Sequence, residues 1–199
     1  MQEIIIATSN PNKAKEFRSI FDTDKYEIKT LLDLPDVPEI RETGDTFQEN
    51  ATIKAHTVME KYHLPTIADD SGLEVDELFG QPGVRSARYA GDHNDAANNA
   101  KLLSNLGGIP EEKRNARFVT VLVFANPNNP EDLVVEGEVK GRIANFPEGD
   151  NGFGYDPLFY VPELGKTMAE VPMEEKNKIS HRGNAIRKLK SKWQDWIIW

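Results

Sequence analysis

Two adjacent carboxylates, Asp69 and Asp70, follow an apolar run and precede Ser71 and Gly72. Paired carboxylates of this kind can hold a hard divalent cation through oxygen ligands or take a proton from water. Ile67 and Ala68 predict the end of a buried strand, and Gly72 predicts a turn that leads the chain into residues 73–75. The same residues are also good turn formers, so an acidic turn without function remains an alternative.

A second polar group lies between an expected strand at residues 4–7 and an expected helix that begins near Asn10. Backbone N–H groups at a helix start, with Lys13 in the first turn, provide a place where a phosphate could bind. The alternative is that Ser9 or Asn10 only caps the helix while Lys13 is solvated. The segment is not a Walker loop, because the required glycines are missing.

A longer helix is expected to begin at Thr46, where a capping box with Glu49 precedes a stripe of apolar residues. Asn50 and Lys54 share a face of this helix, one turn apart, and a solvated helix surface is the favoured interpretation for them. Glu42 lies in the loop that precedes the helix. Because strand-helix-strand closure returns the chain to the two aspartates, this loop is expected to lie near them.

The C-terminal third contains a glycine-rich loop, residues 148–157, with the aromatic residues Phe153 and Tyr155. An aromatic ring in such a loop can stack on a nucleobase, an interaction worth about 1–3 kcal/mol per base. The alternative is that both rings cover hydrophobic surface beneath the loop. His181 and Arg182 follow in the first turn of an expected final helix. Because cations are disfavoured at a helix N-terminus, this pair indicates an electronegative group nearby.

The remaining elements must position these groups. Apolar patterns predict strands at residues 26–31, 116–125 and 133–139, and a helix at residues 95–106. The last two strands are expected to form a long antiparallel hairpin through an Asn- and Pro-rich turn at residues 126–130. This hairpin is expected to form a second lobe.

Composition limits the class of protein. The length of 199 residues predicts one domain, or one elongated domain of two lobes, over residues 1–199. The fractions of hydrophobic residues, 38%, and charged residues, 29%, are typical of globular proteins. The absence of cysteine excludes disulfides, thiolate metal sites and cysteine nucleophiles. A net charge of -9 argues against nucleic acid or an anionic membrane as a partner. We expect a cytoplasmic location, since no signal peptide or membrane span is evident.

Taken together, these residues resemble the inosine/xanthosine triphosphate pyrophosphatases, which remove deaminated purine nucleotides. The markers extend over nearly the whole chain and are Thr8-Ser9-Asn10 with Lys13, Glu42-Thr43-Gly44 with Thr46-Phe47 and Glu49-Asn50-Ala51, Ala68-Asp69-Asp70-Ser71-Gly72-Leu73, Ser86-Ala87-Arg88-Tyr89, Phe153-Gly154-Tyr155-Asp156-Pro157 and Ser180-His181-Arg182. The resemblance implies hydrolysis of ITP, dITP and XTP to the monophosphate and pyrophosphate, with Mg²⁺, in a homodimer. It also implies an α/β fold of two lobes around a long mixed β-sheet with flanking helices, with a nucleotide cleft between the lobes.

The resemblance assigns roles to particular residues. Asp70 is expected to be the catalytic base or metal-bound carboxylate, and Glu42 is expected to hold Mg²⁺ with it. Asp69 and Glu39 are further candidate metal ligands; Glu39 is included because Arg41 stands where many relatives are expected to carry another acid. The expected phosphate-binding residues are Thr8, Ser9, Asn10, Pro11, Asn12, Lys13, Lys54 and Ser71. The expected base-binding residues are Phe153, Gly154, Tyr155, Asp156, Lys176, His181 and Arg182.

Base selection is expected to follow from hydrogen-bond polarity. Donors at Lys176, His181 and Arg182 would favour the 6-oxo group of inosine and xanthine over the 6-amino group of adenine. Phe153 is expected to stack on the base, and Asp156 could accept its N1–H. Guanine shares the 6-oxo group, so the pocket must reject its 2-amino group.

Other functions remain open at this point. A related group, the septum-inhibitor-like nucleotide pyrophosphatases, acts on methylated or pyrimidine nucleotides, and the His181-Arg182 pair with the Phe153 loop counts against it. A nucleotide sensor without turnover would use the same pocket, but binding alone does not require a base such as Asp70. A purely structural domain would have no reason to place these charges at the ends of its elements.

Overall fold

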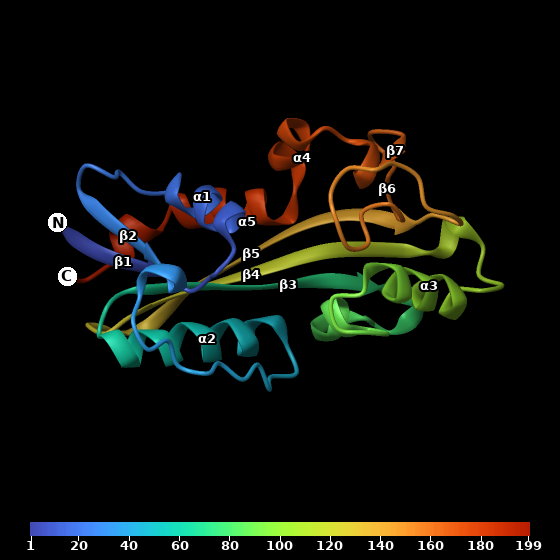
Figure 1. Ribbon diagram of the computed structural model, residues 1–199. Helices are drawn as coiled ribbons and strands as arrows, with labels where there is room; N and C mark the ends of the chain where they lie inside the picture. Colours follow the sequence, from blue (N-terminus) through green and yellow to red (C-terminus); the bar gives the residue numbers. More distant parts are fainter. The chain divides into compact units, whose positions relative to one another are not determined.

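The computed structural model describes residues 1–199 and is an α/β protein with one seven-stranded mixed sheet, in the order β2-β1-β3-β4-β5-β6-β7 (Figure 1). The strands are β1 Gln2–Ile6, β2 Tyr26–Thr30, β3 Thr66–Val75, β4 Asn115–Asn126, β5 Asn129–Ile143, β6 Phe159–Val161 and β7 Lys166–Thr167. The helices are α1 Pro11–Arg18, α2 Phe47–Tyr62, α3 Asp95–Asn105, α4 Met173–Ile179, α5 His181–Lys190 and α6 Trp193–Trp196. β1 pairs in parallel with β2 and β3, whereas β6 pairs antiparallel with β5 and β7. The expected α/β class with a mixed sheet is therefore confirmed.

The chain divides into two compact units. Unit 1 consists of Met1–Asp70, Thr120–Gly137 and Gly183–Trp199, and unit 2 consists of Ser71–Val119 and Glu138–Arg182. The prediction that the β4–β5 hairpin forms a second lobe is wrong, because its turn and the adjoining strand residues belong to unit 1 while the outer parts of both strands belong to unit 2. None of the helices is both long and apolar enough to cross a membrane.

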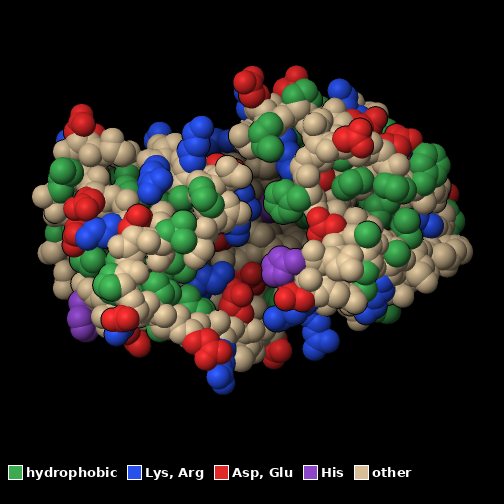
Figure 2. Space-filling view, viewed as in Figure 1, with side chains coloured by type: hydrophobic (Ala, Val, Ile, Leu, Met, Phe, Trp, Pro, Cys, Tyr) green, Lys and Arg blue, Asp and Glu red, His purple; other side chains and the backbone are tan.

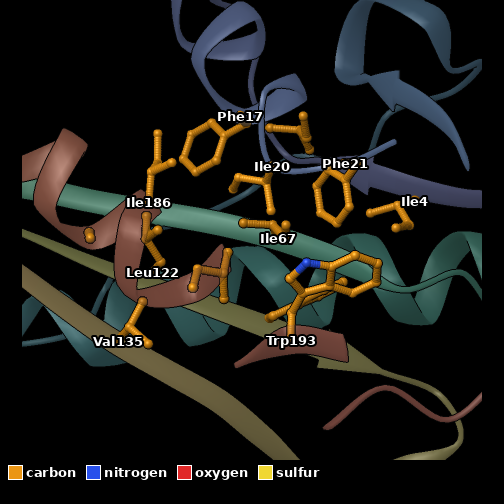
Figure 3. Close-up of a cluster of buried hydrophobic side chains, with 13 residues drawn as sticks. Ile4, Phe17, Ile20, Phe21, Ile67, Leu122, Val135, Ile186 and Trp193 are labelled. Carbon is orange, nitrogen blue, oxygen red and sulfur yellow. The ribbon is translucent and has the colours of Figure 1, made fainter. Parts of the chain in front are cut away.

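Unit 1 has a core of aliphatic and aromatic side chains. Ile4, Phe17, Leu122, Ile186 and Trp193, from β1, α1, β4, α5 and α6, point toward one another (Figure 3). In Figure 1, α1 and α5 lie on one side of the strands of unit 1 and α2 lies on the other. Burial of these side chains stabilises β1 and the elements packed against it. The candidate polar residues that follow β1 in the sequence are thereby held in place.

The start of α2 follows the prediction only in part. Thr46 is the N-cap, and its hydroxyl accepts a hydrogen bond from the Glu49 N–H at 3.1 Å. The Glu49 carboxylate accepts from the Asp45 N–H at 2.7 Å, one residue earlier than a capping box requires. Asn50 is buried on the same helix, so the expectation that it lies on a solvated surface is wrong.

The predicted turn after the two aspartates is also wrong. β3 continues from Thr66 to Val75, so Asp69, Asp70 and Gly72 are strand residues. β3 lies between β1 and β4 in the sheet, and strand pairing within the sheet outweighs the local turn preference of these residues. The carboxylates are consequently held by a regular strand.

Three further boundaries refine the predictions. The hairpin turn is shorter than residues 126–130, because β4 reaches Asn126 and β5 begins at Asn129. The short helix α4 was not predicted. Ser180, in extended conformation, separates α4 from α5, and His181 and Arg182 are the first residues of α5, as expected.

Unit 2 has its own core, which includes Leu73, Leu102, Phe118, Tyr155 and Phe159. The Tyr155 side chain is buried, and its hydroxyl donates a hydrogen bond to the carbonyl of Ser86 at 2.6 Å. For Tyr155, therefore, the packing alternative is confirmed. The rest of the loop that carries it is not part of this core.

Candidate functional site

Unit 1 gathers two lysines and several carboxylates around β3. Asp69 is only 3% exposed, and its Oδ2 lies 2.8 Å from Nζ of Lys13, in the first turn of α1. Nζ of Lys54, from α2, donates to the main-chain carbonyl of Asp69 at 2.9 Å and lies 2.7 Å from Oε1 of Glu42. Tertiary structure therefore brings together four of the predicted residues, which come from three separate parts of the sequence.

Asp70 has a strongly shifted pKa. Burial raises the pKa of Asp70 to about 6, and the nearby Glu42 carboxylate also raises it, whereas Lys54 and a hydrogen bond with Asn50 lower it. A carboxyl that titrates close to neutral pH, next to another acid and a lysine, is typical of a catalytic site.

Lys54 balances these acids. Burial would lower the pKa of Lys54, but the carboxylates of Asp69, Glu42 and Asp70 outweigh burial, so its pKa is raised. The side chain is 18% exposed. Lys54 therefore keeps its positive charge at neutral pH, and the prediction that it lies on a solvated helix surface is wrong.

Asn50 is a site residue to which sequence reasoning gave no role. Its Oδ1 accepts a hydrogen bond from the Gly44 N–H at 2.7 Å, and its side chain also bonds to Asp70. The signal was present in the sequence, because a polar residue on the apolar stripe of α2 needs a buried partner.

The phosphate-binding candidates lie between β1 and α1. Asn10 caps α1, and its Oδ1 accepts from the N–H groups of Asn12 at 2.9 Å and Lys13 at 3.4 Å. The Thr8 hydroxyl accepts from the Asn10 N–H at 3.1 Å, while Ser9 is exposed. A small cavity of about 140 Å³ is bordered by Thr8, Ser9, Asn10, Pro11, Ala14, Arg18, Thr30, Leu32 and Asp33. The capping role of Asn10 is confirmed, and phosphate binding stays a prediction.

The metal-ligand candidates are arranged unevenly. Glu39 contacts Arg41 at 3.2 Å through each carboxylate oxygen, and both side chains are about three-quarters exposed. Glu39 is not among the charges that shift the pKa of Asp70, whereas Glu42 is. No group of three or more His, Cys, Asp or Glu side chains is arranged to hold a metal ion. Glu42 and Asp70 remain as the pair of carboxylates that could share a cation.

Unit 2 holds the base-binding candidates. Nζ of Lys176, in α4, lies 2.5 Å from Oδ2 of Asp156, and both side chains are largely buried. The same oxygen accepts the Phe153 N–H at 3.1 Å. The Phe153 ring is 70% exposed, and the Lys176 Nζ lies 5.3 Å from its centroid. An accessible aromatic ring is thus held next to a buried ion pair.

Three further candidates for nucleotide binding are His181 and Arg182, at the start of α5, and Ser71, in β3. His181 stacks on Phe118, with ring centroids 5.2 Å apart and an interplanar angle of 22°. Arg182 follows in the first turn of α5, and Ser71 follows Asp70 in β3. Their contacts with a nucleotide stay predictions.

Comparison with known proteins identifies the family of this chain. Residues 4–192 match the model of the Ham1 family. A dITP/XTP pyrophosphatase from Lactiplantibacillus plantarum is 58% identical, over 98% of this chain and 96% of that protein. The structure of the Ham1 protein from Staphylococcus aureus superimposes with a TM-score of 0.91 at 45% identity, over 98% of this chain and 99% of that one. A nucleoside-triphosphatase / dITP/XTP pyrophosphatase from Mycobacterium abscessus gives a TM-score of 0.83 at 43% identity, covering 94% and 97% of the two chains.

The α/β sheet and the polar groups in its two units therefore define a protein of the nucleotide pyrophosphatase class. The chain belongs to the Ham1 family.

Proposed function

We propose that this protein hydrolyses non-standard purine nucleoside triphosphates, dITP, ITP and XTP, to the monophosphate and pyrophosphate. The observation that carries the proposal is Asp70, whose carboxyl has a pKa of about 6 next to Glu42 and Lys54. The relatives named dITP/XTP pyrophosphatase support the choice of substrate. Such a reaction would remove these nucleotides from the pool before they enter DNA or RNA.

The ionised Asp70 takes a proton from a water that attacks the α-phosphorus. A bond forms between the water oxygen and the α-phosphorus, the bond from this phosphorus to the bridging oxygen breaks, and its electron pair leaves with pyrophosphate. Lys13 and Lys54 neutralise charge on the phosphates as it develops. Ser71 and the polar side chains of the segment Thr8 to Asn12, at the N-terminus of α1, donate hydrogen bonds to the phosphate oxygens. Pro11 in this segment has no N–H and contributes only by contact.

The two carboxylates fit a magnesium ion. Glu42 raises the pKa of Asp70 because the two negative charges repel each other, and a divalent cation bound by both would remove this cost. Mg²⁺ is commonly held by one or two protein carboxylates together with waters and substrate phosphates, so a third acid is not required. When bound, Mg²⁺ would supply charge neutralisation and activation of water. Asp69, paired with Lys13, and the exposed Glu39 are weaker candidates.

The purine is recognised by the residues of unit 2. Phe153 stacks on the base, and Lys176, His181 and Arg182 donate hydrogen bonds to the 6-oxo group. Adenine presents a donor at this position and is rejected. Asp156 holds Lys176 in place and accepts the N1–H of the base.

We also propose that the enzyme acts as a homodimer in the cytoplasm, without a nucleic-acid or membrane partner. The net charge of -9 supports the absence of polyanionic partners. In the face shown in Figure 2, basic side chains are scattered among acidic ones.

The test is pyrophosphate release from dITP, ITP, XTP, GTP and ATP at alkaline pH, with and without Mg²⁺. We expect metal-dependent release from the first three. Asp70→Asn should fold and bind dITP but lose turnover by at least about a hundredfold, while Asp76→Asn, at an exposed position, should match the wild type. Binding of dITP without release by the wild type would favour a sensor, and release only from methylated or pyrimidine nucleotides would favour the related group.

A further inference from the structure

The helix α3 holds the backbone of one residue, Gly154, in the loop that carries Phe153. The Asp95 carboxylate accepts a hydrogen bond from the Gly154 N–H at 2.9 Å, and the Asn99 Nδ2 donates to the Gly154 carbonyl at 2.9 Å. Asp95 and Asn99 are four residues apart and therefore share one face of α3. Both polar groups of a single glycine are thus bound by one helix.

Gly154 requires this support because of its backbone conformation. Its φ is +61°, in the left-handed region that glycine adopts without steric cost. Glycine also has the largest conformational entropy to lose, so an unsupported Gly154 would sample many conformations. The orientation of the preceding residue, Phe153, depends on the conformation that is fixed here.

The other ends of the loop are held by different contacts. Tyr155 is anchored in the core of unit 2 through Ser86, and Asp156 is anchored by Lys176. Phe153 is held by Asp156 through its backbone, with its N–H donating to the carboxylate at 3.1 Å and its carbonyl accepting from the Asp156 N–H at 3.2 Å, while its ring is 70% exposed. The two hydrogen bonds from α3 therefore constrain the residue that directly follows Phe153 in the sequence.

These two α3 residues contribute little to the core. Asp95 is exposed, and neither residue belongs to the hydrophobic cluster of unit 2. Oδ1 of Asn99 is buried without a hydrogen-bond partner, an arrangement that costs free energy. Because Asn99 carries this cost and still binds the loop carbonyl, we infer that it positions the loop rather than stabilises the fold.

We propose that Asp95 and Asn99 are positioning residues for recognition of the purine base. They fix the Gly154 backbone on both sides of its Cα so that the Phe153 ring is presented to the base in one orientation, which lowers the entropy lost on binding. This inference rests on the proposed function, because it takes the ligand of Phe153 to be a purine.

Three variants distinguish loss of the two Gly154 hydrogen bonds from a general loss of stability. Asp95→Ala removes the acceptor for the Gly154 N–H, whereas Asp95→Asn keeps an acceptor oxygen at the same place. Asn99→Asp has nearly the same shape but turns an oxygen toward the Gly154 carbonyl. Asn105→Asp is the matched control, because Asn105 lies on the same helix and donates to the Tyr89 hydroxyl at 2.6 Å rather than to the loop.

We expect Asp95→Ala and Asn99→Asp to raise KM for dITP roughly fivefold or more, with kcat within about twofold of the wild type. Asp95→Asn and the Asn105 control should retain the wild-type KM. The inhibition constant of tripolyphosphate, which has no base, should stay unchanged in all four variants. Parallel weakening of dITP and tripolyphosphate, or an unchanged KM for dITP, would overturn the proposal.

Amide hydrogen exchange of Gly154 in the ligand-free protein tests the same constraint without turnover. Exchange should be faster in Asp95→Ala and close to the wild-type rate in Asp95→Asn; equal rates in both would show that α3 does not hold the loop. If the wild type releases no pyrophosphate from dITP, the proposed function fails and base recognition fails with it, while the exchange result still decides whether α3 holds Gly154.

Discussion

Nζ of Lys13 lies 2.8 Å from Oδ2 of Asp69, and the Asp69 side chain is almost completely buried. This ion pair ties the first turn of α1 to β3. In the proposed reaction the lysine therefore approaches the phosphates from a position that is fixed before the substrate binds. Because the Asp69 carboxylate is paired with Lys13, it is better placed to orient this lysine than to bind a metal ion.

Lys13→Met should leave the Asp69 carboxylate buried without its cation. Removal of one partner of a fully buried pair costs about 3–5 kcal/mol, and because Lys13 is partly exposed we expect a loss of roughly 1–3 kcal/mol in the free energy of unfolding. Urea denaturation at pH 7 measures it. Lys15→Met, at an exposed position of the same helix, is the control, and equal losses in the two variants would show that the pair does not stabilise the fold.

Asp70 makes stability depend on pH. Its pKa is raised from 3.8 to about 6 by folding, so the folded protein binds the proton more tightly, and this stabilisation is complete below about pH 4 and lost as the pH rises through 6. Asp70→Asn should therefore increase the free energy of unfolding at pH 8 by about 1–3 kcal/mol relative to the wild type, with no difference near pH 4. Guanidinium denaturation in metal-free buffer at both pH values measures the two free energies of unfolding. A difference between the variant and the wild type that does not depend on pH would contradict the raised pKa of Asp70.

Lys54 and Glu42 should move the pKa of Asp70 in opposite directions. Lys54 lowers the pKa of Asp70 and Glu42 raises it, so Lys54→Met should raise the titration midpoint of Asp70 and Glu42→Gln should lower it. Carboxyl carbon NMR of the metal-free protein reports the midpoint directly. Lys61→Met, at an exposed position of α2, should leave it unchanged. Shifts of the same sign in the two site variants would contradict this electrostatic arrangement.

Gly152→Ala should disturb the ion pair between Asp156 and Lys176. An added Cβ would overlap Oδ2 of Asp156, and φ is +76°, so the carboxylate must move. We expect KM for dITP to rise by about tenfold, with inhibition by tripolyphosphate unchanged. Gly165→Ala is the control, because its φ is +65° but a Cβ there meets no atom within 4 Å. Similar effects of both substitutions would attribute the loss to backbone strain alone.

The sequence predicted the elements whose signals are local. The proline at the start of α1, the Thr46 cap of α2 and the long apolar run of β4 each indicate an element within a few residues of its observed bounds. β3 was placed too short because its continuation through Asp69 and Gly72 depends on pairing within the sheet, which a local turn preference cannot reveal. The short α4 has no comparable periodic pattern.

The sequence predicts candidate site residues but not the contacts between them. The acids, lysines and aromatic residues were identified by type, order and resemblance. That Lys13 pairs with Asp69 and that Lys54 pairs with Glu42 depends on contacts between residues far apart in the chain. The buried role of Asn50 and the binding of Gly154 by α3 arise from tertiary structure in the same way.

The division of the chain has a consequence for synthesis. Unit 1 includes both the first and the last residues, and the buried Leu189 and Trp193 of its core come from the final segment. On the ribosome, this core therefore cannot close until residues 183–199 have emerged, although Lys13 and Asp70 are made early. A product that stalls before these residues would carry Lys13 and Asp70 but lack the packing of Leu189 and Trp193 in the same unit.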